Sequence, residues 1–548
     1  MWSRKGLVEV RDTTSVERAV ERCVRRVRSA ARTSAAGLRD GRDRARRRLG
    51  DGRDRARQRL RDATPQQRQT LALATGSATL GLLVAVTAVA ATGPWDSGQR
   101  TAERVRAAGR EETSGAHHTG AEQGRGTLKT PEVLAAVGPL EKAGAGTRTP
   151  GRADSVPPPT ASALADTLEP LLDDPALGRS PSASVHDASS GKQLFGVAEG
   201  RAATPASTVK LATATAALSA RGADHRITTK AVVDGGRVVL VGGGDPTLTR
   251  GQLDALAKRS AADLRERGRK KVDLGYDTTR YSGTRQHPIG PNDNLAPVTP
   301  LMVEEGRLDG SHKGPAPRSD DPAGEAAARF AEQLEDHGVR VEGPASHHKA
   351  PKDAETLAAH RSAPLSELVE RMLTNSDNDI AEALARQTAL DSRKSADFEA
   401  GGRAVAAELR KLGMPVKRAE FADGSGLDRA DKVSASLLSR LLVTAADPDR
   451  DHLRSVLTGL PVAGFTGTLD GRYDDADGKG GAGLVRAKTG TLTGVNTLAG
   501  TVVDAEGRLL AFSFLTHGAK DPQGAQRALD RVASALANCG CHDSPSAR

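Results

Sequence analysis

The feature of this sequence that most constrains its fold is a set of strand-like runs divided between the two ends of one long region. Near the start of the region, Ala183–His186 and Lys192–Val197 flank the turn ASSG. Near its end come three further runs of the same kind: Gly483–Thr493, Leu498–Val503 and Arg508–Thr516. A single sheet can contain all five runs only if the chain returns to it after a long excursion.

A helix accompanies the strands at each end. Apolar residues at helical spacing precede the first strands: Leu164, Leu168, Leu171 and Leu172. A second apolar stripe follows the last strand: Ala525, Leu529, Val532 and Leu536. We therefore expect an α/β layer in which terminal helices cover five strands. Everything between Leu218 and Arg486 must then be helical region or insertion.

The middle of the region shows strands and helices of its own. Residues 227–241 have the pattern of a hairpin, 251–267 that of a helix and 271–276 that of a strand. Residues 321–341 add a further helix and strand, and the pattern turns helical again from Leu365. We expect the strands of this middle part to form an inserted α/β subdomain.

The positive charge of the chain is concentrated at its N-terminus. Residues 1–68 hold 21 Lys and Arg against 9 Asp and Glu, a surplus that exceeds the net charge of +10 for the whole chain. They include the tandem repeat GRDRARRRL and GRDRARQRL, whose eleven-residue period suits a long solvated helix. No recognised nucleic-acid-binding module accompanies the charge, and aromatic residues make up only 2% of the chain. Nucleic-acid binding is therefore not expected, while weak binding to anionic lipid stays open.

An uncharged stretch follows, from Gln69 to Trp95. Within it Leu71–Thr92 provides 22 mostly apolar residues, enough to cross the core of a bilayer as a helix. The basic flank favours a single-pass anchor with the N-terminus in the cytoplasm and the rest of the chain outside. A cleaved signal peptide is one alternative, because Ala88-Val89-Ala90 resembles a cleavage site. A buried helix of a globular domain is the other.

A tether separates this segment from the folded region. Residues 93–159 are rich in Gly, Thr, Ala, Arg and Pro and show little periodicity, which indicates a flexible linker. The expected division of the chain is a basic cytoplasmic segment at 1–68, a transmembrane anchor at 69–92, a linker at 93–159, a main domain at 160–222 and 360–540, and an inserted subdomain at 223–359.

The three cysteines, Cys23, Cys539 and Cys541, indicate neither a disulfide framework nor a zinc site. One residue separates the last two. The sequence leaves open a strained ring between them, pairing with another chain, or free thiols.

The pattern Ser-x-x-Lys occurs three times, and its context differs each time. Ser189 and Lys192 fall in the expected hairpin turn, and Ser346 and Lys349 in the loop PASHHKAP, which no helix follows. Ser207 and Lys210 instead stand at the start of a predicted helix. There Thr204 is expected to cap the helix, with Pro205 in its first turn, and an apolar stripe follows: Leu211, Ala214 and Leu218.

This helical context gives the pair Ser207 and Lys210 a chemical meaning. A spacing of three residues places both side chains on one helix face, within reach of a shared proton. Serine needs a base to become a nucleophile, and lysine is a base only if its pKa falls from about 10.4. Burial, a helix N-terminus and a second cation nearby all lower a lysine pKa.

Two further motifs complete the candidate site. AKTGTLTG places Lys488, Thr489, Gly490 and Thr491 on a predicted strand, where Lys488 is the proposed second cation and the glycine lets a ligand backbone approach closely. TNSDND places Ser376 and Asn378 at a break between helices. A hydroxyl and an amide at such a break are suited to relaying a proton and holding a peptide group.

These three motifs in this order form a known catalytic signature of penicillin-binding proteins and class A β-lactamases. Residues 164–539 resemble the class C penicillin-binding proteins, the D-alanyl-D-alanine carboxypeptidases of peptidase family S13. Four further stretches resemble connecting motifs of that family: VGGGDPTL, GYDTTRYSG, ADGSGLDR and GTLDGRY. The resemblance implies the penicillin-recognising serine transferase fold, a five-stranded antiparallel sheet flanked by helices plus a helical region, with one inserted subdomain.

The resemblance also implies a role for each site residue. Ser207 would be the acylated nucleophile, Lys210 its general base, and Ser376 a proton shuttle toward the leaving group. Asn378 would hold the substrate's peptide chain, and Lys488 would provide positive potential. The substrate carboxylate would bind the hydroxyls of two residues beside Gly490, Thr489 and Thr491. The oxyanion hole would consist of the backbone N–H groups of Ser207 and Thr491.

The interval from Lys210 to Ser376 departs from the pattern of the larger family members, which carry two inserted domains. The interval is shorter here, so we expect one reduced insertion. Any substrate specificity or dimerisation that the missing domain provides elsewhere therefore stays open. The same interval is much too long for a class A β-lactamase.

The function implied is that of a serine-type D-Ala-D-Ala carboxypeptidase, anchored in the bacterial cell membrane with an extracellular catalytic domain. Peptidoglycan stem peptides would be its substrates, D,D-endopeptidase activity is an open addition, and β-lactams would acylate Ser207. Neither a cofactor nor a metal is implied. A β-lactamase is one alternative, and a catalytically weak wall-associated scaffold or β-lactam sensor is another, although a scaffold has no need for an intact catalytic set. Stem-peptide specificity and oligomeric state stay open.

Overall fold

The computed structural model describes residues 157–391, 395–474 and 478–540. The expected basic segment, the expected membrane span at 69–92 and nearly all of the expected linker lie outside these residues. Within the described part of the chain, no helix combines the length and the apolar character that a membrane crossing requires. Cys539 is buried and disulfide-bonded.

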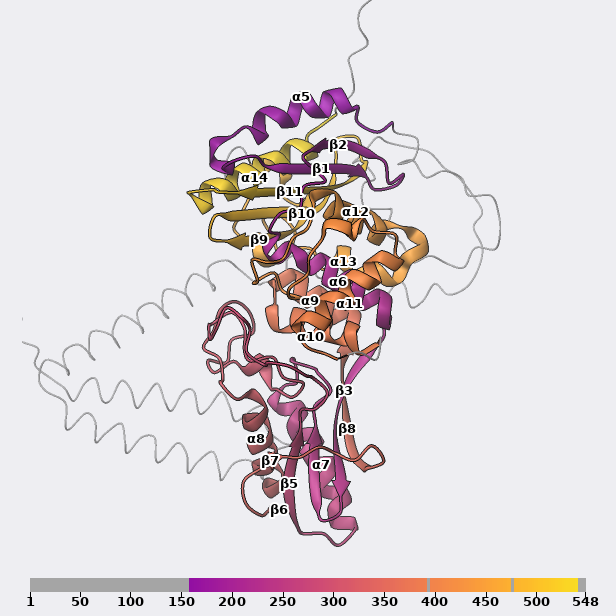
Figure 1. The fold of residues 1–548 in the computed structure, drawn as a ribbon, viewed down its shortest axis with the longest axis vertical. Coiled ribbons are helices and arrows are strands. Elements are labelled where there is room, and N and C mark those ends of the chain that lie inside the picture. Colours follow the sequence, from indigo (N-terminus) through magenta and orange to yellow (C-terminus); the bar gives the residue numbers. More distant parts are fainter. Residues whose placement is uncertain (1–156, 392–394, 475–477, 541–548) are drawn as a thin grey trace, which may run out of the picture. The chain divides into compact units, whose positions relative to one another are not determined.

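A five-stranded antiparallel sheet forms the centre of the main domain (Figure 1). Its strands, in spatial order, are β2 (Gln193–Val197), β1 (Ser182–Asp187), β11 (Leu509–His517), β10 (Val495–Val503) and β9 (Val485–Leu492). The first and last thirds of the domain therefore meet between β1 and β11, where Val185 lies opposite Phe512. This arrangement confirms the prediction that both ends of the region build one sheet.

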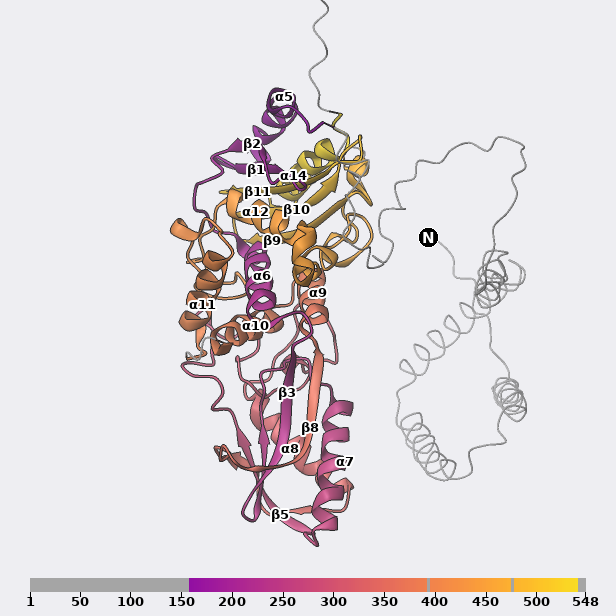
Figure 2. The same cartoon turned by 90° about the vertical axis from the view of Figure 1, so that its right-hand side faces the viewer.

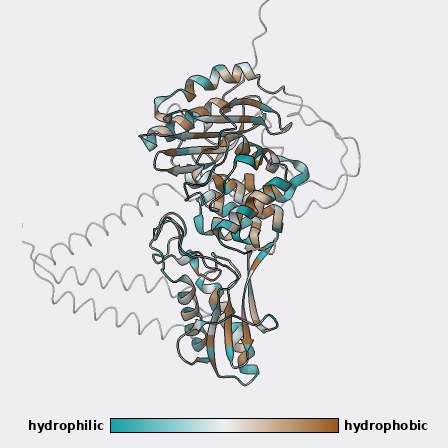
Figure 3. Cartoon of the chain, in the orientation of Figure 1, coloured by the Kyte–Doolittle hydropathy of each residue, from teal (hydrophilic) through white to brown (hydrophobic). Residues whose placement is uncertain are grey.

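Two terminal helices cover one face of this sheet: α5 (Ala161–Leu172) and α14 (Pro522–Ala537). Leu168 of α5 and Leu529 of α14 are buried in one cluster with Phe512 and Phe514 of the sheet. Helix α5 carries both hydrophobic and hydrophilic residues in Figure 3, as expected for a helix with a single buried face.

A helical region covers the other face (Figures 1 and 2). Its helices are α6 (Lys210–Arg221), α9 (Leu365–Asn375), α10 (Asn378–Asp391), α11 (Phe398–Lys411), α12 (Ala435–Ala446) and α13 (Ser455–Thr458). Nine consecutive residues at the start of α6, from Lys210 to Leu218, are buried, so this helix runs through the middle of the domain. Because α6 is buried on all sides, its first residue, Lys210, has little access to solvent.

The insertion folds around a second, mixed sheet with the order β6-β5-β4-β3-β8, and β7 pairs with β5. Its elements are β3 (Arg226–Asp234), β4 (Arg237–Val241), α7 (Arg250–Glu266), β5 (Lys271–Asp277), α8 (Pro322–Asp336), β6 (Arg340–Val341), β7 (Ser346–His347) and β8 (Glu355–Pro364). Strands β3 and β8 lie side by side and carry the chain into and out of the insertion (Figures 1 and 2). Strand β8 was not predicted, and it crosses the expected boundary at residue 359.

Between β5 and α8 the insertion contains a long segment, residues 278–321, that is almost free of regular structure. Its one short turn is η5. The structure's 3-10 turns are η3 (Pro175–Leu177), η4 (Ala206–Val209), η5 (Glu304–Gly306), η6 (Val416–Arg418), η7 (Pro448–Leu453), η8 (Gly467–Leu469) and η9 (Lys479–Gly481). The sequence predicted no helix or strand within residues 278–320, because irregular backbone has no periodicity to detect.

The prediction that Thr204 caps a helix is wrong. The chain enters α6 through the 3-10 turn η4, whose first position has no side-chain cap. The Thr204 hydroxyl is used elsewhere, since it donates to the carbonyl oxygen of Arg429 at 3.3 Å and accepts from Lys432 Nζ at 3.1 Å. Its partners lie more than 200 residues away in sequence, so local propensity could not reveal them.

Candidate active site

Ser207 and Lys210 lie one turn apart on the same face of the η4–α6 junction, as the sequence predicts. Lys210 Nζ lies 3.0 Å from Ser207 Oγ. The other two Ser-x-x-Lys matches do not share this geometry, because Ser189 Oγ donates to Asp187 in the β1–β2 turn and Ser346 belongs to the short strand β7. The structure thus singles out Ser207 as the candidate nucleophile.

The partners of Lys210 direct its lone pair. Lys210 Nζ lies 2.7 Å from Asn378 Oδ1 and 2.6 Å from the carbonyl oxygen of Ser425. Both oxygens can only accept hydrogen bonds; the amide orientation of Asn378 follows from its Nδ2, which donates to the carbonyl oxygen of Asn294 at 2.9 Å. A neutral Lys210 amine therefore gives its two hydrogens to these oxygens and turns its lone pair toward the Ser207 hydroxyl.

The pKa of Lys210 is lowered to about 8. Burial is the main cause, since the side chain is fully buried, and the negative charges of Asp423 and Glu382 partly oppose it. The sequence predicts that the charge of Lys488 lowers the pKa of Lys210, but in the structure burial and then the charge of Lys210 lower the pKa of Lys488 well below its usual value.

Ser376 and Asn378 stand at a break between helices, as predicted, where α9 ends and α10 begins. Ser376 adopts a left-handed φ of 58°, which is uncommon for a residue other than glycine and concentrates at functional sites. Its hydroxyl lies 2.9 Å from Lys488 Nζ, which also donates to the carbonyl oxygen of Thr489 at 2.7 Å. The break thus brings a second serine and lysine pair beside the first.

The residues of the Lys-Thr-Gly motif lie on a strand, β9, as predicted, and the structure places this strand at the edge of the sheet. Thr491 lines the cavity described below, and Gln526 donates to its hydroxyl at 3.4 Å. Thr489 is buried, and its hydroxyl lies 2.8 Å from that of Thr468, which also lines the cavity. Of the two threonines, Thr491 is therefore the one placed directly toward a ligand.

Gly490 is required for a reason that differs from the predicted one. A Cβ at this position would lie 2.2 Å from Thr497 Oγ1, 2.8 Å from the carbonyl oxygen of Pro205 and 3.1 Å from the backbone nitrogen of Ser207. The chain that approaches Gly490 closely is therefore the turn carrying the nucleophile, rather than a ligand backbone. Glycine here allows η4 to pack directly on β9.

An open cavity of about 280 Å³ joins these groups. Its lining includes residues of the three predicted motifs, Ser207, Ser376, Asn378 and Thr491, together with Thr468 and Leu427. The insertion contributes Asn294, Arg307, Gly314, Pro315 and Arg318 from segment 278–321. One wall of the candidate active site is thus built by the insertion.

Sequence reasoning assigned no role to three residues that the structure places in the site: Asn294, Ser425 and Thr468. Ser425 lies in the stretch ADGSGLDR and Thr468 in GTLDGRY, both noted for their resemblance to family motifs. The backbone carbonyl oxygen of Asn294 accepts a hydrogen bond from Asn378, and a backbone contact of this kind cannot be predicted from a pattern of side chains.

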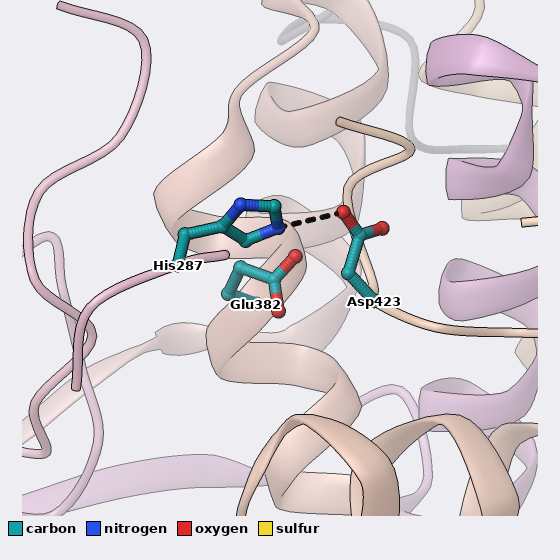
Figure 4. Close-up of side chains that lie close together, drawn as sticks. All are labelled: His287, Glu382 and Asp423. Carbon is teal, nitrogen blue, oxygen red and sulfur yellow. Dashed lines mark hydrogen bonds and ion pairs between the residues drawn. The ribbon is translucent and has the colours of Figure 1, made fainter. Parts of the chain in front are cut away.

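Two groups of buried side chains have the donor atoms of a metal site: Glu305, Asp377 and Asp379 in the first, and His287, Glu382 and Asp423 in the second (Figure 4). In the first group, Arg307 binds Glu305 at 2.7 Å and Arg318 binds Asp379 at 2.8 Å. In the second, His287 binds Asp423 and an arginine, Arg386, binds Glu382 at 3.1 Å. Asp377 accepts the backbone N–H of Ile380 at Oδ1, at 3.0 Å, and only its Oδ2 lacks a hydrogen-bond partner among the carboxylate oxygens of the two groups. Since protein donors already bind every one of these carboxylates, we assign no metal to either group.

Comparison with known proteins agrees with this geometry. Residues 164–317 and 305–536 match the D-Ala-D-Ala carboxypeptidase 3 (S13) family. The chain belongs to this family. It shares 36% identity over 404 residues with carboxypeptidase DacB of Mycolicibacterium smegmatis, covering 71% of this chain and 86% of that protein. With carboxypeptidase Rv3627c of Mycobacterium tuberculosis it shares 32% over 446 residues, covering 78% and 92%.

The fold agrees with a solved member of the penicillin-binding proteins. The crystal structure of penicillin binding protein 4 from Haemophilus influenzae matches with a TM-score of 0.55 and 24% identity, covering 68% of this chain and 97% of that one. This match and the five-stranded sheet confirm the expected penicillin-recognising serine transferase fold. The family member described here is a class C penicillin-binding protein and a serine-type D-Ala-D-Ala carboxypeptidase.

Proposed function

We propose that this carboxypeptidase removes the terminal D-Ala from peptidoglycan stem peptides through an acyl-Ser207 intermediate, and that it also cuts D,D cross-links. The single observation that carries the proposal is the environment of Lys210. This buried amine lies 3.0 Å from Ser207 Oγ, while two acceptor oxygens take its hydrogens. Such an amine is a ready general base for a serine nucleophile.

In the proposed first step, Ser207 Oγ attacks the carbonyl carbon of the penultimate D-Ala, and the hydroxyl proton moves to Lys210 Nζ. The C–N bond then breaks, and the proton that Lys210 took from Ser207 is relayed through Ser376, which lies beside Lys488, to the nitrogen of the terminal D-Ala. The backbone N–H groups of Ser207 and Thr491 bind the developing oxyanion; both residues line the cavity. Water then attacks the ester, releases the shortened peptide and restores Ser207.

Lys488 and its neighbours are suited to the substrate's terminal carboxylate. The pKa of free Lys488 is depressed by burial and by the charge of Lys210, but an arriving carboxylate favours the charged form of the lysine and raises that pKa. Thr491 lines the cavity, and the hydroxyl of Thr489 lies 2.8 Å from that of Thr468, which lines it as well. Asn378, which binds Lys210, also lines the cavity where the peptide chain would lie.

We further propose that the chain is anchored in the bacterial cell membrane by residues 69–92, with the catalytic part outside the cell. The support is the uncharged, mostly apolar run that follows a strongly basic segment. Fractionating cells that produce the full chain, or a chain lacking residues 1–92, tests this. Recovery of both in the soluble fraction would contradict the anchor.

A fluorescent penicillin and a D-Ala-D-Ala peptide together test the catalytic proposal. The full chain is expected to form a stable penicillin adduct on Ser207 and to release D-Ala from the peptide, whereas Ser207→Ala should do neither. The Haemophilus influenzae protein of the same fold has also been crystallised with a β-lactam. An adduct that hydrolyses rapidly would indicate a β-lactamase, and an adduct without D-Ala release would indicate a sensor or scaffold.

The rate of Ser207 acylation is expected to rise with pH and to level off above about pH 8. Only the neutral form of Lys210 accepts a proton, and its pKa is about 8. Below that value each pH unit should change the rate about tenfold, because the neutral fraction changes by that factor. Short incubations with fluorescent penicillin between pH 5.5 and 9.5 measure the profile. A flat profile from pH 6 to 9 would exclude Lys210 as the titrating base.

A further inference from the structure

A histidine from the insertion is buried against the main domain behind the catalytic lysine. His287 lies in segment 278–321, and its side chain is only 1% exposed. Its Nε2 lies 3.0 Å from Asp423 Oδ2, and its ring packs edge-on against Phe398 at 5.1 Å between centroids. Figure 4 shows the imidazole pointing at Asp423, with Glu382 of α10 beside both. The pair thus joins the insertion to the stretch ADGSGLDR.

The direction of the His287 hydrogen bond follows from its second nitrogen. The backbone N–H of Ile289 donates to His287 Nδ1 at 3.2 Å. A neutral ring that accepts at Nδ1 carries its hydrogen on Nε2, and a protonated ring carries one there as well. In either state Nε2–H donates to the Asp423 carboxylate.

Asp423 in turn shapes the loop that holds Lys210. Its Oδ1 accepts the backbone N–H groups of Ser425 at 2.9 Å and Gly426 at 2.6 Å. These bonds orient the peptide unit whose carbonyl oxygen, on Ser425, accepts from Lys210 Nζ at 2.6 Å. A continuous path of three hydrogen bonds therefore runs from His287 through Asp423 and Ser425 to the catalytic amine.

The same loop also touches the nucleophile. A Cβ on Gly426 would lie 2.1 Å from the carbonyl oxygen of Ala206 and 3.0 Å from the backbone nitrogen of Ser207. Ala206 has a left-handed φ of 48°, so the backbone just before Ser207 is held in a strained conformation. A shift of the loop would therefore disturb both Lys210 and the turn that presents Ser207.

Charges around Asp423 are arranged so that it keeps its negative charge. Burial would raise the pKa of Asp423, but hydrogen bonds from His287, Asp431 and the backbone of Gly426 lower it to about 2. Burial and the charge of Asp423 raise the pKa of Asp431 to about 10, so this second carboxyl stays protonated at neutral pH. An ionised Asp423 is the stronger acceptor for the N–H groups that set the loop.

We propose that His287 is a positioning residue for Lys210, acting through Asp423 and the carbonyl oxygen of Ser425. The insertion thereby helps to set the geometry of the catalytic base, in addition to forming one wall of the cavity. The proposal rests on the proposed function, in which Lys210 is that base.

Two substitutions separate the two hydrogen bonds of His287. In His287→Gln the side-chain amide nitrogen takes the place of Nε2 and can donate to Asp423, whereas in His287→Asn the side-chain oxygen takes the place of Nδ1 and can accept only from Ile289. If the link to Asp423 positions Lys210, His287→Asn should lower the acylation rate constant of Ser207 by about 10- to 100-fold. His287→Gln should stay within a few-fold of the wild type.

The measurement is stopped-flow acylation of the full chain by a fluorescent penicillin, which separates noncovalent binding from acylation. The noncovalent dissociation constant should not change in either variant, because His287 does not line the cavity. Val298→Ala is the matched control. Val298 lies in the same segment and packs with Phe398 in the small core beneath it. It should lower the melting temperature without changing the acylation rate constant.

Each other outcome overturns the proposal. Wild-type acylation by His287→Asn would show that the link to Asp423 is dispensable. If His287→Asn and His287→Gln lowered the acylation rate constant equally, the role of His287 would be purely structural. The same would follow if Val298→Ala also lowered the rate constant, in proportion to its loss of melting temperature. If the wild-type chain itself failed to acylate at Ser207, the proposed function would fail instead, so the two failures are distinguishable.

Discussion

Lys210→Arg is expected to slow the acylation of Ser207 by about 10²- to 10⁴-fold, the range for loss of a general base. Arginine keeps a positive charge and several donors, but it does not release its proton in proteins. The two carbonyl acceptors that fix the Lys210 amine would then bind N–H groups, and none of the guanidinium nitrogens could accept the Ser207 proton. Time courses with fluorescent penicillin, with circular dichroism to verify folding, measure the effect.

Lys192→Arg is the matched control, because Lys192 belongs to another Ser-x-x-Lys match but lies in an exposed hairpin turn. It should acylate at the wild-type rate. Because arginine is larger than the buried lysine, Lys210→Gln serves as a second variant that keeps donors without overfilling the site. Near-normal acylation by a folded Lys210→Arg or Lys210→Gln chain would remove Lys210 as the base.

Gly490→Ala is expected to lower the acylation rate by about 10²- to 10³-fold, comparable to losing one donor of an oxyanion hole. The added methyl group would lie 2.8 Å from the carbonyl oxygen of Pro205 and 3.1 Å from the backbone nitrogen of Ser207, so the η4 turn must move away from β9. That movement displaces the proposed Ser207 N–H donor relative to Thr491. Acylation kinetics and a thermal melt of the variant measure the two consequences.

Gly251→Ala is a suitable control for Gly490→Ala, since a Cβ at position 251 meets no atom within 4 Å. It lies in α7 of the insertion, and we expect unchanged acylation and a stability equal to or slightly above the wild type. If Gly490→Ala acylated as fast as this control, the close packing of η4 on β9 would have no catalytic importance.

Much of the fold could be predicted because its elements have clear periodicity. The strand-like runs at the two ends and the apolar stripes of α5 and α14 appear in the structure where the sequence places them. The spacing of Ser207 and Lys210 was equally informative, because three residues on a helix bring two side chains to one face whatever surrounds them. Their Nζ to Oγ distance of 3.0 Å follows from that local geometry.

Other parts of the site could not be predicted, because they depend on contacts between distant residues. Thr204 has the side chain of a helix cap, yet Arg429 and Lys432 engage its hydroxyl. Gly490 has the features of a ligand-contacting strand glycine, yet the turn before Ser207 occupies the space beside it. Local preference is weak against partners that only the folded chain supplies.

The sequence by itself determined the order of the strands along the chain, the three motifs of the candidate active site and the family that they indicate. Only the tertiary structure decided how those motifs become one site. Burial lowers the pKa of Lys210, and the side-chain amide oxygen of Asn378 and the backbone carbonyl oxygen of Ser425 orient its lone pair. Only the tertiary structure shows that His287 is linked to Lys210 through Asp423 and Ser425. The physical reason is that desolvation and hydrogen-bond direction depend on every neighbour in space, while sequence periodicity reports only on neighbours along one element.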